Sequence, residues 1–463
     1  MPVPPIPLVG DEVVVPCVDG VERVACGFDA AASTGALPSV AAAVTEMLPM
    51  YSSVHRGAGW KSQRATAAYE QARKAVLRFA GRPVDGDDVA VLCRNTTEAI
   101  NHIAYRLRLA PDDVVVTTVA EHHANLLPWG RVATRRYVDC GVDGTFTVDD
   151  VVAALTVAGP PPKLLAITGA SNVTGWLPPI DAIIDAAHAV GVPVLVDGAQ
   201  LAPHRPLPIA ADYVAFSGHK LYAPFGASAF VGPRSSFADG DPFLAGGGAV
   251  DLVDLDEVVW TDPPEREEAG SPNVIGAVAL HAALDELTSV GWAAIAEHEH
   301  AVGGRMRRGL AALPGVRLLG PPVDGGVETL ALATFVVEGV PHALVAARLS
   351  AEFGIATRHG CFCAHPYLLR LLGLSDAEVE AYRGDVLRGD RRSIPGAVRA
   401  SAGINTTDAD VDRLLDAVAR VATGDKAPVE YEQDEVTGDW WPLGDLPGWS
   451  AADRALGASC SRG

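Results

Sequence analysis

The chain has 463 residues, of which 49% are hydrophobic and 20% charged, and its formal net charge is −21. A chain of this length is too long for one small core, so we expect two domains and an appendage. The excess of acidic residues argues against nucleic acids and anionic membranes as partners, because both would repel a polyanion.

The N-terminal segment has neither a basic stretch nor a long apolar one. No part of the chain reaches the roughly 18 uninterrupted apolar residues of a membrane span. We therefore expect a cytoplasmic protein without a membrane partner. The seven cysteines are scattered along the chain, a pattern typical of reduced thiols rather than of a disulfide framework.

Hydrophobic periodicity predicts the elements in chain order. Residues 11–29 indicate two short strands joined at an Asp-Gly turn, and helical patterns follow at 37–49 and 62–80. Apolar strands then alternate with helices, which indicates a mostly parallel sheet covered on both faces. The predicted strands are 89–93, 113–119, 163–168, 192–196, 212–216 and 227–231.

The predicted fold class is therefore α/β. A large domain at 28–285 would hold the mostly parallel sheet, which we expect to be of the seven-stranded type. Residues 1–27 and 286–424 would form a smaller α+β domain, which ends in a capped helix at 406–422. Residues 425–463 are polar, rich in Trp, Gly and Pro, and without periodicity, so we expect a surface tail there.

Polar clusters follow the predicted strands, and ligands of such sheets bind beyond the carboxyl ends of the strands. Asp197 follows one apolar strand, and Lys220 follows the next. Pyridoxal 5′-phosphate (PLP) requires a lysine amine, an acid for its pyridine nitrogen, phosphate donors and a group that stacks on its ring. The further candidates are Thr96 and Thr97 at a helix start, Ser217 and His219 for the phosphate, His122 for stacking, and Asn172 and Gln200 for the phenolic oxygen or a substrate carboxylate.

Each of these residues alone would be unremarkable, since an Asp after a strand is usually a turn residue and a Thr pair is usually a helix cap. All of them occur in order, however, each after its own strand, in a chain with no rival site. We therefore interpret the set as a PLP site.

The motifs of this set resemble those of the class V aminotransferase fold group, PLP fold type I, and most closely group II cysteine desulfurases and selenocysteine lyases. The resemblance covers about residues 11 to 422, and two motifs, EHHAN and SGHKLYAP, are highly specific. The matching segments are YSSVHRG (51–57), RNTTEAIN (94–101), EHHANLLPW (121–129), SNVTG (171–175), VDGAQ (196–200), FSGHKLYAPFG (216–226), EAGSPN (268–273), RHGCFCAHP (358–366) and VRASAGINTT (398–407).

This resemblance implies a role for each residue. Lys220 would bind the cofactor covalently, Asp197 would pair with its pyridine nitrogen and Gln200 with its ring oxygen. Arg399 would bind the substrate carboxylate, for which a bidentate guanidinium is suited, and Cys363 occupies the position of the nucleophile. Thr97, Ser217 and His219 would hold the phosphate, and Ser271 would reach the site of the other subunit of a homodimer.

The chain departs from the desulfurase pattern in three places. Around the nucleophile it has RHGCFCAHP where desulfurases resemble RTGHHCAMP, and the Gly-Cys-Phe-Cys form is closer to sulfurase domains that act on molybdenum cofactor. A longer charged segment at 368–397 is expected near the mouth of the site, where it could set the sulfur acceptor. The tail beyond 425 has no recognisable counterpart. These departures leave the acceptor open, either a protein or a small molecule.

His359, Cys361, Cys363 and His365 alternate along the chain, a pattern that invites a metal interpretation. Four such ligands within seven residues would crowd one ion, so we expect no metal. A disulfide between Cys361 and Cys363 would be strained.

The predicted activity is sulfur removal from L-cysteine or a close analogue, giving alanine and a persulfide on Cys363. Two alternatives stay open. One is a C–S or C–Se β-lyase, or another enzyme of this fold, in which Cys363 is a bystander. The other is an interaction protein with a vestigial site, against which the intact Lys220, Asp197 and Arg399 argue.

Overall fold

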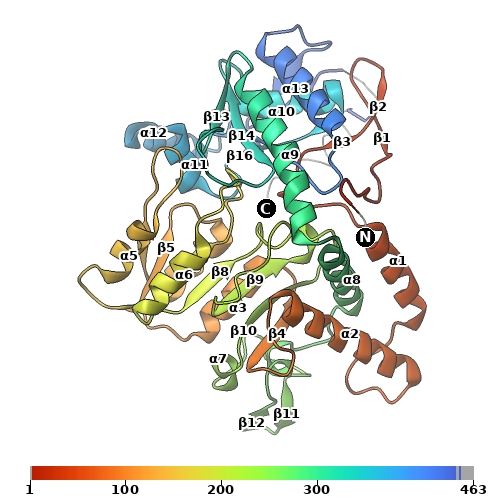
Figure 1. The fold of residues 1–463 in the computed structure, drawn as a ribbon, viewed down its shortest axis with the longest axis vertical. Coiled ribbons are helices and arrows are strands. Elements are labelled where there is room, and N and C mark those ends of the chain that lie inside the picture. The colour runs from red at the N-terminus through yellow and green to blue at the C-terminus, as the bar shows by residue number, and fades with distance from the viewer. Residues whose placement is uncertain (1–2, 445–447, 450–463) are drawn as a thin grey trace.

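The computed structural model describes residues 3–444 and 448–449. Its main element is a seven-stranded sheet in the order β4-β10-β9-β8-β7-β5-β6 (Figure 1), in which β10 alone runs antiparallel to its neighbours. The predicted seven-stranded, mostly parallel sheet is confirmed. The strands are β4 (Asp88–Cys93), β5 (Val114–Thr118), β6 (Thr134–Val138), β7 (Pro162–Thr168), β8 (Val194–Asp197), β9 (Tyr213–Ser217) and β10 (Ser228–Pro233).

Alternate residues of these strands enter two separate cores. Val91, for example, packs on the side of α3 (Thr96–Arg106), whereas its neighbour Ala90 packs on the side of α2 (Trp60–Phe79), α6 (Ile180–Ala189) and α8 (Val274–Val290). Because side chains alternate along a strand, a sheet covered on both faces needs apolar residues at every position. This requirement explains the continuous apolar runs from which six of the seven strands were predicted.

A second sheet has four antiparallel strands in the order β13-β14-β17-β16, and lies above the large sheet in Figure 1. Its strands are β13 (Val316–Leu319), β14 (Leu332–Val337), β16 (Arg358–Gly360) and β17 (Ala397–Ser401). Helices α9 (Trp292–Ala311), α10 (His342–Phe353) and α13 (Asp408–Ala422) pack on it. α13 begins with a capping box of Thr407 and Asp410, as its sequence predicts.

The N-terminal segment joins this second unit. The predicted hairpin is present as β1 (Val14–Pro16) and β2 (Glu22–Val24), and β3 (Cys26–Gly27) pairs in parallel with β15 (Ile355–Ala356). The segment that precedes α1 (Pro38–Met47) therefore runs from the small sheet toward the large one. The domain boundaries themselves stay a prediction.

The segment after 425, expected as a surface tail, contains regular structure that the sequence did not indicate. β18 (Tyr431–Gln433) and β19 (Trp440–Pro442) form an antiparallel hairpin. Strands of three residues are too short to show a period, which explains why the sequence did not reveal them. The end of the predicted extension, at 445–447 and 450–463, lies outside the described residues.

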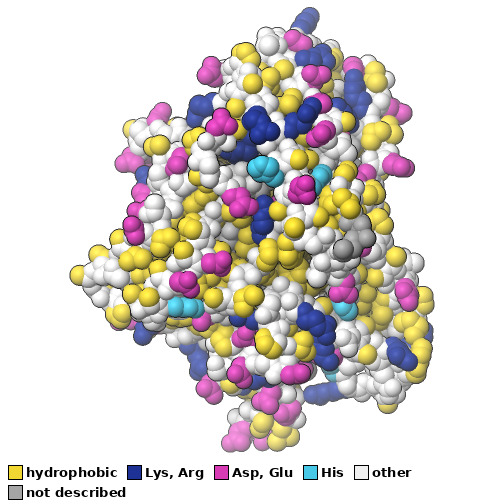
Figure 2. Space-filling model, in the orientation of Figure 1, with side chains coloured by type: hydrophobic (Ala, Val, Ile, Leu, Met, Phe, Trp, Pro, Cys, Tyr) yellow, Lys and Arg dark blue, Asp and Glu magenta, His cyan; other side chains and the backbone are white. Residues whose placement is uncertain are grey.

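A further hairpin, β11 (Val250–Val253) with β12 (Val258–Trp260), projects from the large domain. Its exposed side chains combine apolar residues, among them Leu252 and Leu255, with several carboxylates, as Figure 2 shows at the lower end of the molecule. In the described part of the chain no single helix is long and apolar enough to cross a membrane; α8 and α9 pass that test only as a pair bent by 80°.

Gly218 tests how closely the turn after β9 packs against the backbone just before β10. A Cβ at this position would lie 2.2 Å from the carbonyl oxygen of Ala227, which is backbone that cannot turn away. We expect Gly218→Ala to lower the free energy of unfolding by about 1–3 kcal/mol, the usual cost of overpacking. Urea denaturation measures this free energy of unfolding. Gly247→Ala is the control, because a Cβ there meets nothing within 4 Å. Equal stability of the two variants would contradict this packing.

Candidate active site

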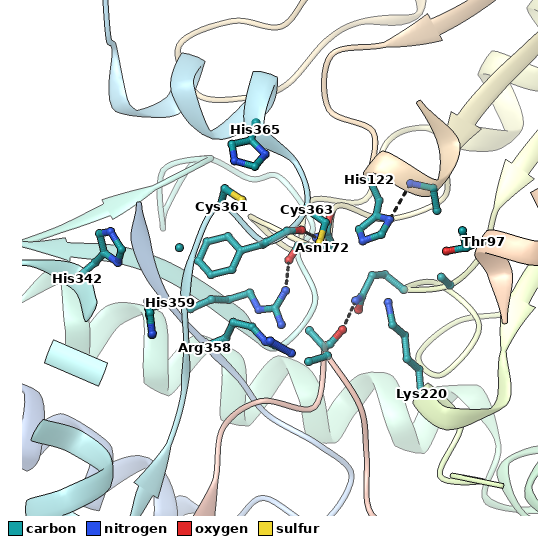
Figure 3. A pocket seen from close by; sticks show the side chains of 18 of the residues that line it. Thr97, His122, Asn172, Lys220, His342, Arg358, His359, Cys361, Cys363 and His365 are labelled. Atoms are coloured by element: carbon teal, nitrogen blue, oxygen red, sulfur yellow. Dashed lines mark hydrogen bonds between the residues drawn. The ribbon is translucent and has the colours of Figure 1, made fainter. Parts of the chain in front are cut away.

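One cavity of about 540 Å³ lies between the carboxyl ends of the large sheet and the edge of the small sheet (Figure 3). It is here that the structure brings most of the predicted site residues together. Those that line the cavity are Thr96, Thr97, His122, Asn172, Asp197, Gln200, Ser217, His219, Lys220, Cys363 and Arg399. Ser271 does not: it is exposed on the loop before α8.

Lys220 ends a short 3-10 helix (Gly218–Lys220) that follows β9. The helix is tied down on two sides, since the Gly218 N–H donates to the Ala227 carbonyl at 3.1 Å and the Thr34 N–H donates to the His219 carbonyl at 2.9 Å. Burial lowers the pKa of the Lys220 amine to about 8, an effect that nearby Asp197 opposes and Arg399 adds to. A substantial part of this amine is therefore neutral near physiological pH, as a nucleophile requires.

Asp197 is the last residue of β8 and is buried. Its Oδ1 accepts a hydrogen bond from the Ala199 N–H at 3.0 Å. Burial raises the pKa of this carboxyl, and the positive charge of Lys220 opposes the rise. A buried carboxylate of this kind is suited to hold a proton on a pyridine nitrogen, because the pair would neutralise the charge inside the protein.

The start of α3 forms the opposite wall. Asn95 caps this helix by accepting a hydrogen bond from the Glu98 N–H, and the backbone N–H of Thr96 donates to the Ser217 hydroxyl at 2.9 Å. The hydroxyls of Thr96 and Ser217 are also hydrogen bonded to each other, at 2.7 Å. Backbone amides and hydroxyls at a helix N-terminus favour a phosphate.

His122 precedes a short 3-10 helix at the end of β5, and its Nδ1 accepts a hydrogen bond from the Ala124 N–H at 3.0 Å. Burial lowers the pKa of this imidazole to about 3, assisted by the positive charge of Lys220. The ring is therefore neutral, with its proton on Nε2. Gln200 is fixed by donating from Nε2 to the Ala31 carbonyl at 2.5 Å.

Arg399 lies on β17, so it belongs to the small sheet while lining the same cavity. Its Nη1 donates to the Asn172 carbonyl at 2.8 Å, and its Nη2 donates to Asp29 Oδ1 at 3.0 Å. Its Nε is buried and has no hydrogen-bond partner among the described residues. Burial lowers the pKa of this guanidinium to about 10. A buried cation with a free donor is a site for a carboxylate.

Cys363 lies in the segment between β16 and α11 (His365–Leu372). Phe362 and Cys363 both have left-handed backbone, with φ of 55° and 53°. This backbone is held from both sides, because the His123 N–H donates to the Cys363 carbonyl at 2.7 Å and Asn172 donates to the Phe362 carbonyl at 2.7 Å. The Cys363 side chain is exposed to the cavity that also holds Lys220.

The alternating histidines and cysteines of this segment do not converge on one point. His359 Nε2 lies 3.3 Å from an Asp439 oxygen, whereas His365 stacks on His123 with ring centroids 5.1 Å apart. Cys361 is half-buried, and burial raises the pKa of its thiol. Within the described ranges no group of three or more His, Cys, Asp or Glu residues could hold a metal ion, and both cysteines are free thiols.

Sequence reasoning missed two carboxylates, the half-buried Asp29 and the buried Glu121. Asp29 accepts a hydrogen bond from Arg399 and another from Arg358, the second at 3.2 Å. Glu121 is fully buried and accepts hydrogen bonds from Thr118, Asn125 and the Thr168 N–H, which ties the turn before His122 to the end of β7. Glu121 stands inside the EHHAN motif and Asp29 in the FDAAAS segment, so both could have been considered.

The residues present fit PLP. A partly neutral lysine amine, a buried carboxylate one strand away and hydroxyls at a helix N-terminus are the donors and acceptors that its aldehyde, pyridine nitrogen and phosphate require. No carboxylate lines the cavity besides Asp197 in the part of the chain that the structure describes.

Comparison with known proteins agrees with this arrangement. The family model for class-V aminotransferases matches residues 27–414. A probable cysteine desulfurase of Mycolicibacterium paratuberculosis is 35% identical over 384 residues, covering 81% of this chain and 52% of the relative. A cysteine desulfurase of Dickeya dadantii is 35% identical over 383 residues, covering 80% of this chain and 85% of the relative.

Solved structures give the same result. The apo cysteine desulfurase of Thermococcus onnurineus aligns with a TM-score of 0.75 at 30% identity, over 86% of this chain and 95% of that one. A cysteine desulfurase of Escherichia coli aligns with a TM-score of 0.72 at 33% identity, also over 86% and 95%. The chain spans about half the length of two mycobacterial relatives, 52% and 58%. On the family model and these relatives together, the chain belongs to the class-V aminotransferase family of PLP-dependent enzymes.

Proposed function

We propose that this protein is a PLP-dependent cysteine desulfurase, which takes sulfur from L-cysteine or a close analogue and leaves alanine. The observation that carries the proposal is that Cys363 lines the same cavity as Lys220 and Arg399. A β-lyase would require no thiol at this place. The relatives that are named cysteine desulfurases support the same activity.

In this proposal Lys220 would hold PLP through its aldehyde, Asp197 through its pyridine nitrogen and Gln200 through its ring oxygen. Thr96, Thr97, Ser217 and His219 would hold the phosphate, and His122 would stack on the ring. When bound, PLP supplies an electron sink for the bonds at the substrate Cα. Side chains of the protein bind the substrate, transfer its proton and accept its sulfur.

Arg399 and Asn172 orient the amino acid. The guanidinium of Arg399 receives the substrate carboxylate, for which its buried and unpartnered Nε is available. Lys220 would be the base that accepts the Cα proton, because burial lowers its pKa to about 8 and so leaves part of the amine neutral near physiological pH. The neutral ring of His122 carries a proton on Nε2 and can donate a hydrogen bond there.

Cys363 then attacks the substrate sulfur as a thiolate. The new S–S bond forms as the Cβ–S bond breaks, and the electron pair of the broken bond stays with the carbon fragment. That fragment is protonated and leaves as alanine, while Cys363 keeps the sulfur as a persulfide. The left-handed backbone at Phe362 and Cys363 presents this thiol at the turn between β16 and α11.

We also propose a cytoplasmic homodimer. Two features support a dimer: Ser271 is exposed outside the cavity, as a residue that serves a partner's site would be, and the β11–β12 hairpin exposes apolar side chains.

Lys220 gives the first test of this proposal. In the cofactor-free enzyme, the rate of PLP attachment should rise with pH through a midpoint near 8, because only the neutral amine attacks an aldehyde and burial lowers its pKa to about 8 from 10.5. Absorbance spectroscopy follows the attachment. Borohydride reduction and peptide mapping should place the label on Lys220; a label on Lys163 or a midpoint near 10.5 would contradict the assignment.

Arg399 gives the second test. Arg399→Ala should raise the KM for the amino-acid substrate by about 30-fold to about 900-fold, equivalent to roughly 2–4 kcal/mol for a lost buried charged partner. Arg399→Lys keeps the charge without the bidentate geometry and should fall in between. The absorbance of the resting cofactor should survive in both variants. Arg388→Ala, an exposed surface change, serves as the control, and a normal KM in Arg399→Ala would show that the carboxylate binds elsewhere.

The third test identifies the product. Wild-type enzyme given L-cysteine should form alanine and gain the mass of one sulfur on the peptide that contains Cys363. Cys363→Ser should lose both, because a hydroxyl cannot accept the sulfur. Cys361→Ser is the matched control and should still form alanine in the presence of a reductant. Pyruvate and ammonia as products, or wild-type turnover by Cys363→Ser, would favour the β-lyase instead.

A further inference from the structure

The cavity does not end at Cys363. The same cavity continues past Cys361 and Cys363 on the side away from Lys220, and we call this part the outer chamber. The residues that define it are His342, His359, Arg391, Arg392, Gln433 and Gly438. Figure 3 shows the two cysteines between these ends, with Thr97 and Lys220 on one side and His342 and His359 on the other. The proposed chemistry on the Lys220 side leaves the outer chamber without a role.

One wall of the outer chamber, which carries Gln433 and Gly438, belongs to a part of the chain beyond the family match, which ends at residue 414. The β18–β19 hairpin is hydrogen bonded to the segment 390–394: the Arg391 N–H donates to the Glu435 carbonyl at 2.9 Å, and Gln433 Nε2 donates to the Arg392 carbonyl at 3.0 Å. Gly438 approaches so closely that a Cβ there would lie 2.6 Å from the Arg391 carbonyl oxygen. The hairpin is therefore closely packed against the segment 390–394.

The charge of the cavity is opposite to that of the protein. Its cationic lining residues are Lys220, Arg358, Arg391, Arg392 and Arg399, and its one acidic residue is Asp197, whereas the chain as a whole carries −21. Lys220 and Arg399 belong to the proposed cofactor and substrate sites. Arg358 is paired with Asp29. Arg391 and Arg392 remain for the outer chamber, and such a local concentration of positive charge attracts anions.

These two arginines differ in what already neutralises them. Arg392 lies 2.7 Å from Asp390 and 3.5 Å from Glu435. Arg391 has no carboxylate partner among the described residues, and its Nη1 donates to the Val436 carbonyl at 3.0 Å. A carbonyl neutralises a guanidinium less than a directly paired carboxylate does, so Arg391 is the stronger attractant for an anion.

Resting on the proposed desulfurase function, we propose that the outer chamber binds a small thiol bearing a carboxylate or phosphate, which accepts the sulfur from Cys363. The acceptor thiolate attacks the outer sulfur of the Cys363 persulfide. A new S–S bond forms to the acceptor as the bond to Cys363 Sγ breaks, and Cys363 leaves as a thiolate that takes up a proton. No oxidant or reductant is consumed, because the sulfur keeps its oxidation state.

The position of Cys361 is consistent with direct transfer to the acceptor. Its thiol lies next to Cys363, but burial raises its pKa, so at neutral pH it is mostly protonated and a weak nucleophile. The cavity of about 540 Å³ has the usual size of a small-molecule site, so a small thiol fits it.

The experiment isolates the second half of the reaction. Enzyme loaded with one equivalent of L-cysteine is freed of excess substrate, and loss of the persulfide mass is timed after addition of 3-mercaptopropionate, 2-mercaptoethanol or cysteamine. Rates are compared per thiolate, since the three thiols differ in pKa. We expect the anionic thiol to exceed the neutral one by about tenfold at low ionic strength, with cysteamine slowest, and the preference to shrink as salt is added.

Two variants test whether the preference for the anionic thiol arises in the outer chamber. Arg391→Ala removes the less neutralised of the two charges, and Thr437→Asp adds a carboxylate to the wall while keeping an oxygen that can accept the Asp439 N–H. The second variant keeps the test valid if the first loosens the hairpin. Both should reduce the anion preference to near unity, and the surface control Arg388→Ala should retain it.

Three results would overturn the proposal: equal or reversed preference in the wild type, an unchanged preference in both wall variants, or discharge by none of the three thiols while a protein acceptor succeeds. Failure of the desulfurase function itself is recognised separately, because wild-type enzyme would then form no alanine in the loading step.

Discussion

The parallel pairing of β8 with β9 is the constraint on which the site depends. It places Asp197 opposite Ala215, so that the chain leaving β9 reaches Lys220 at the same edge of the sheet on which Asp197 ends β8. A buried carboxylate and a buried amine are each costly alone, and each lowers the cost of the other. Their mutual effect is visible in both groups: Lys220 opposes the rise in the pKa of Asp197, and Asp197 opposes the fall in the pKa of Lys220.

A second constraint joins the two sheets. Arg358 and Arg399 are directly paired across β16 and β17, which puts two like charges opposite each other on one small sheet. Such a pair is unfavourable without a counter-charge. Asp29, which enters from the N-terminal segment, supplies it by accepting from both arginines. Arg399 also donates directly to the Asn172 carbonyl after β7, so the small sheet is joined to the strand ends of the large sheet both by this bond and by the N-terminal segment that carries Asp29.

The sequence predicted the part of the structure that is buried on both faces. Strands such as β5 and β8 have no exposed position, so their apolar runs are unmistakable. β6 was missed because it is an edge strand whose residues, Thr-Arg-Arg-Tyr-Val, are mostly accessible. The cofactor side of the site was predicted for the same reason, since each of its residues follows a buried strand. Asp29 was not, because its partners are 329 and 370 residues away in the chain, and no local pattern encodes such a contact.

The tail illustrates the opposite limit of sequence reasoning. A segment without period, such as 430–443, can be well ordered when its order comes from contacts with distant residues rather than from a repeating face. Here those contacts are specific: Tyr431 donates to Glu352 at 3.1 Å, Gln433 bonds the segment before β17, and Asp439 pairs with His359. Because His359 lies on the strand that leads directly to Cys361 and Cys363, the hairpin is anchored to the thiol-bearing segment itself. An addition to the family domain has thus become part of the wall around its most reactive residues, which is the position from which it can select what those residues meet.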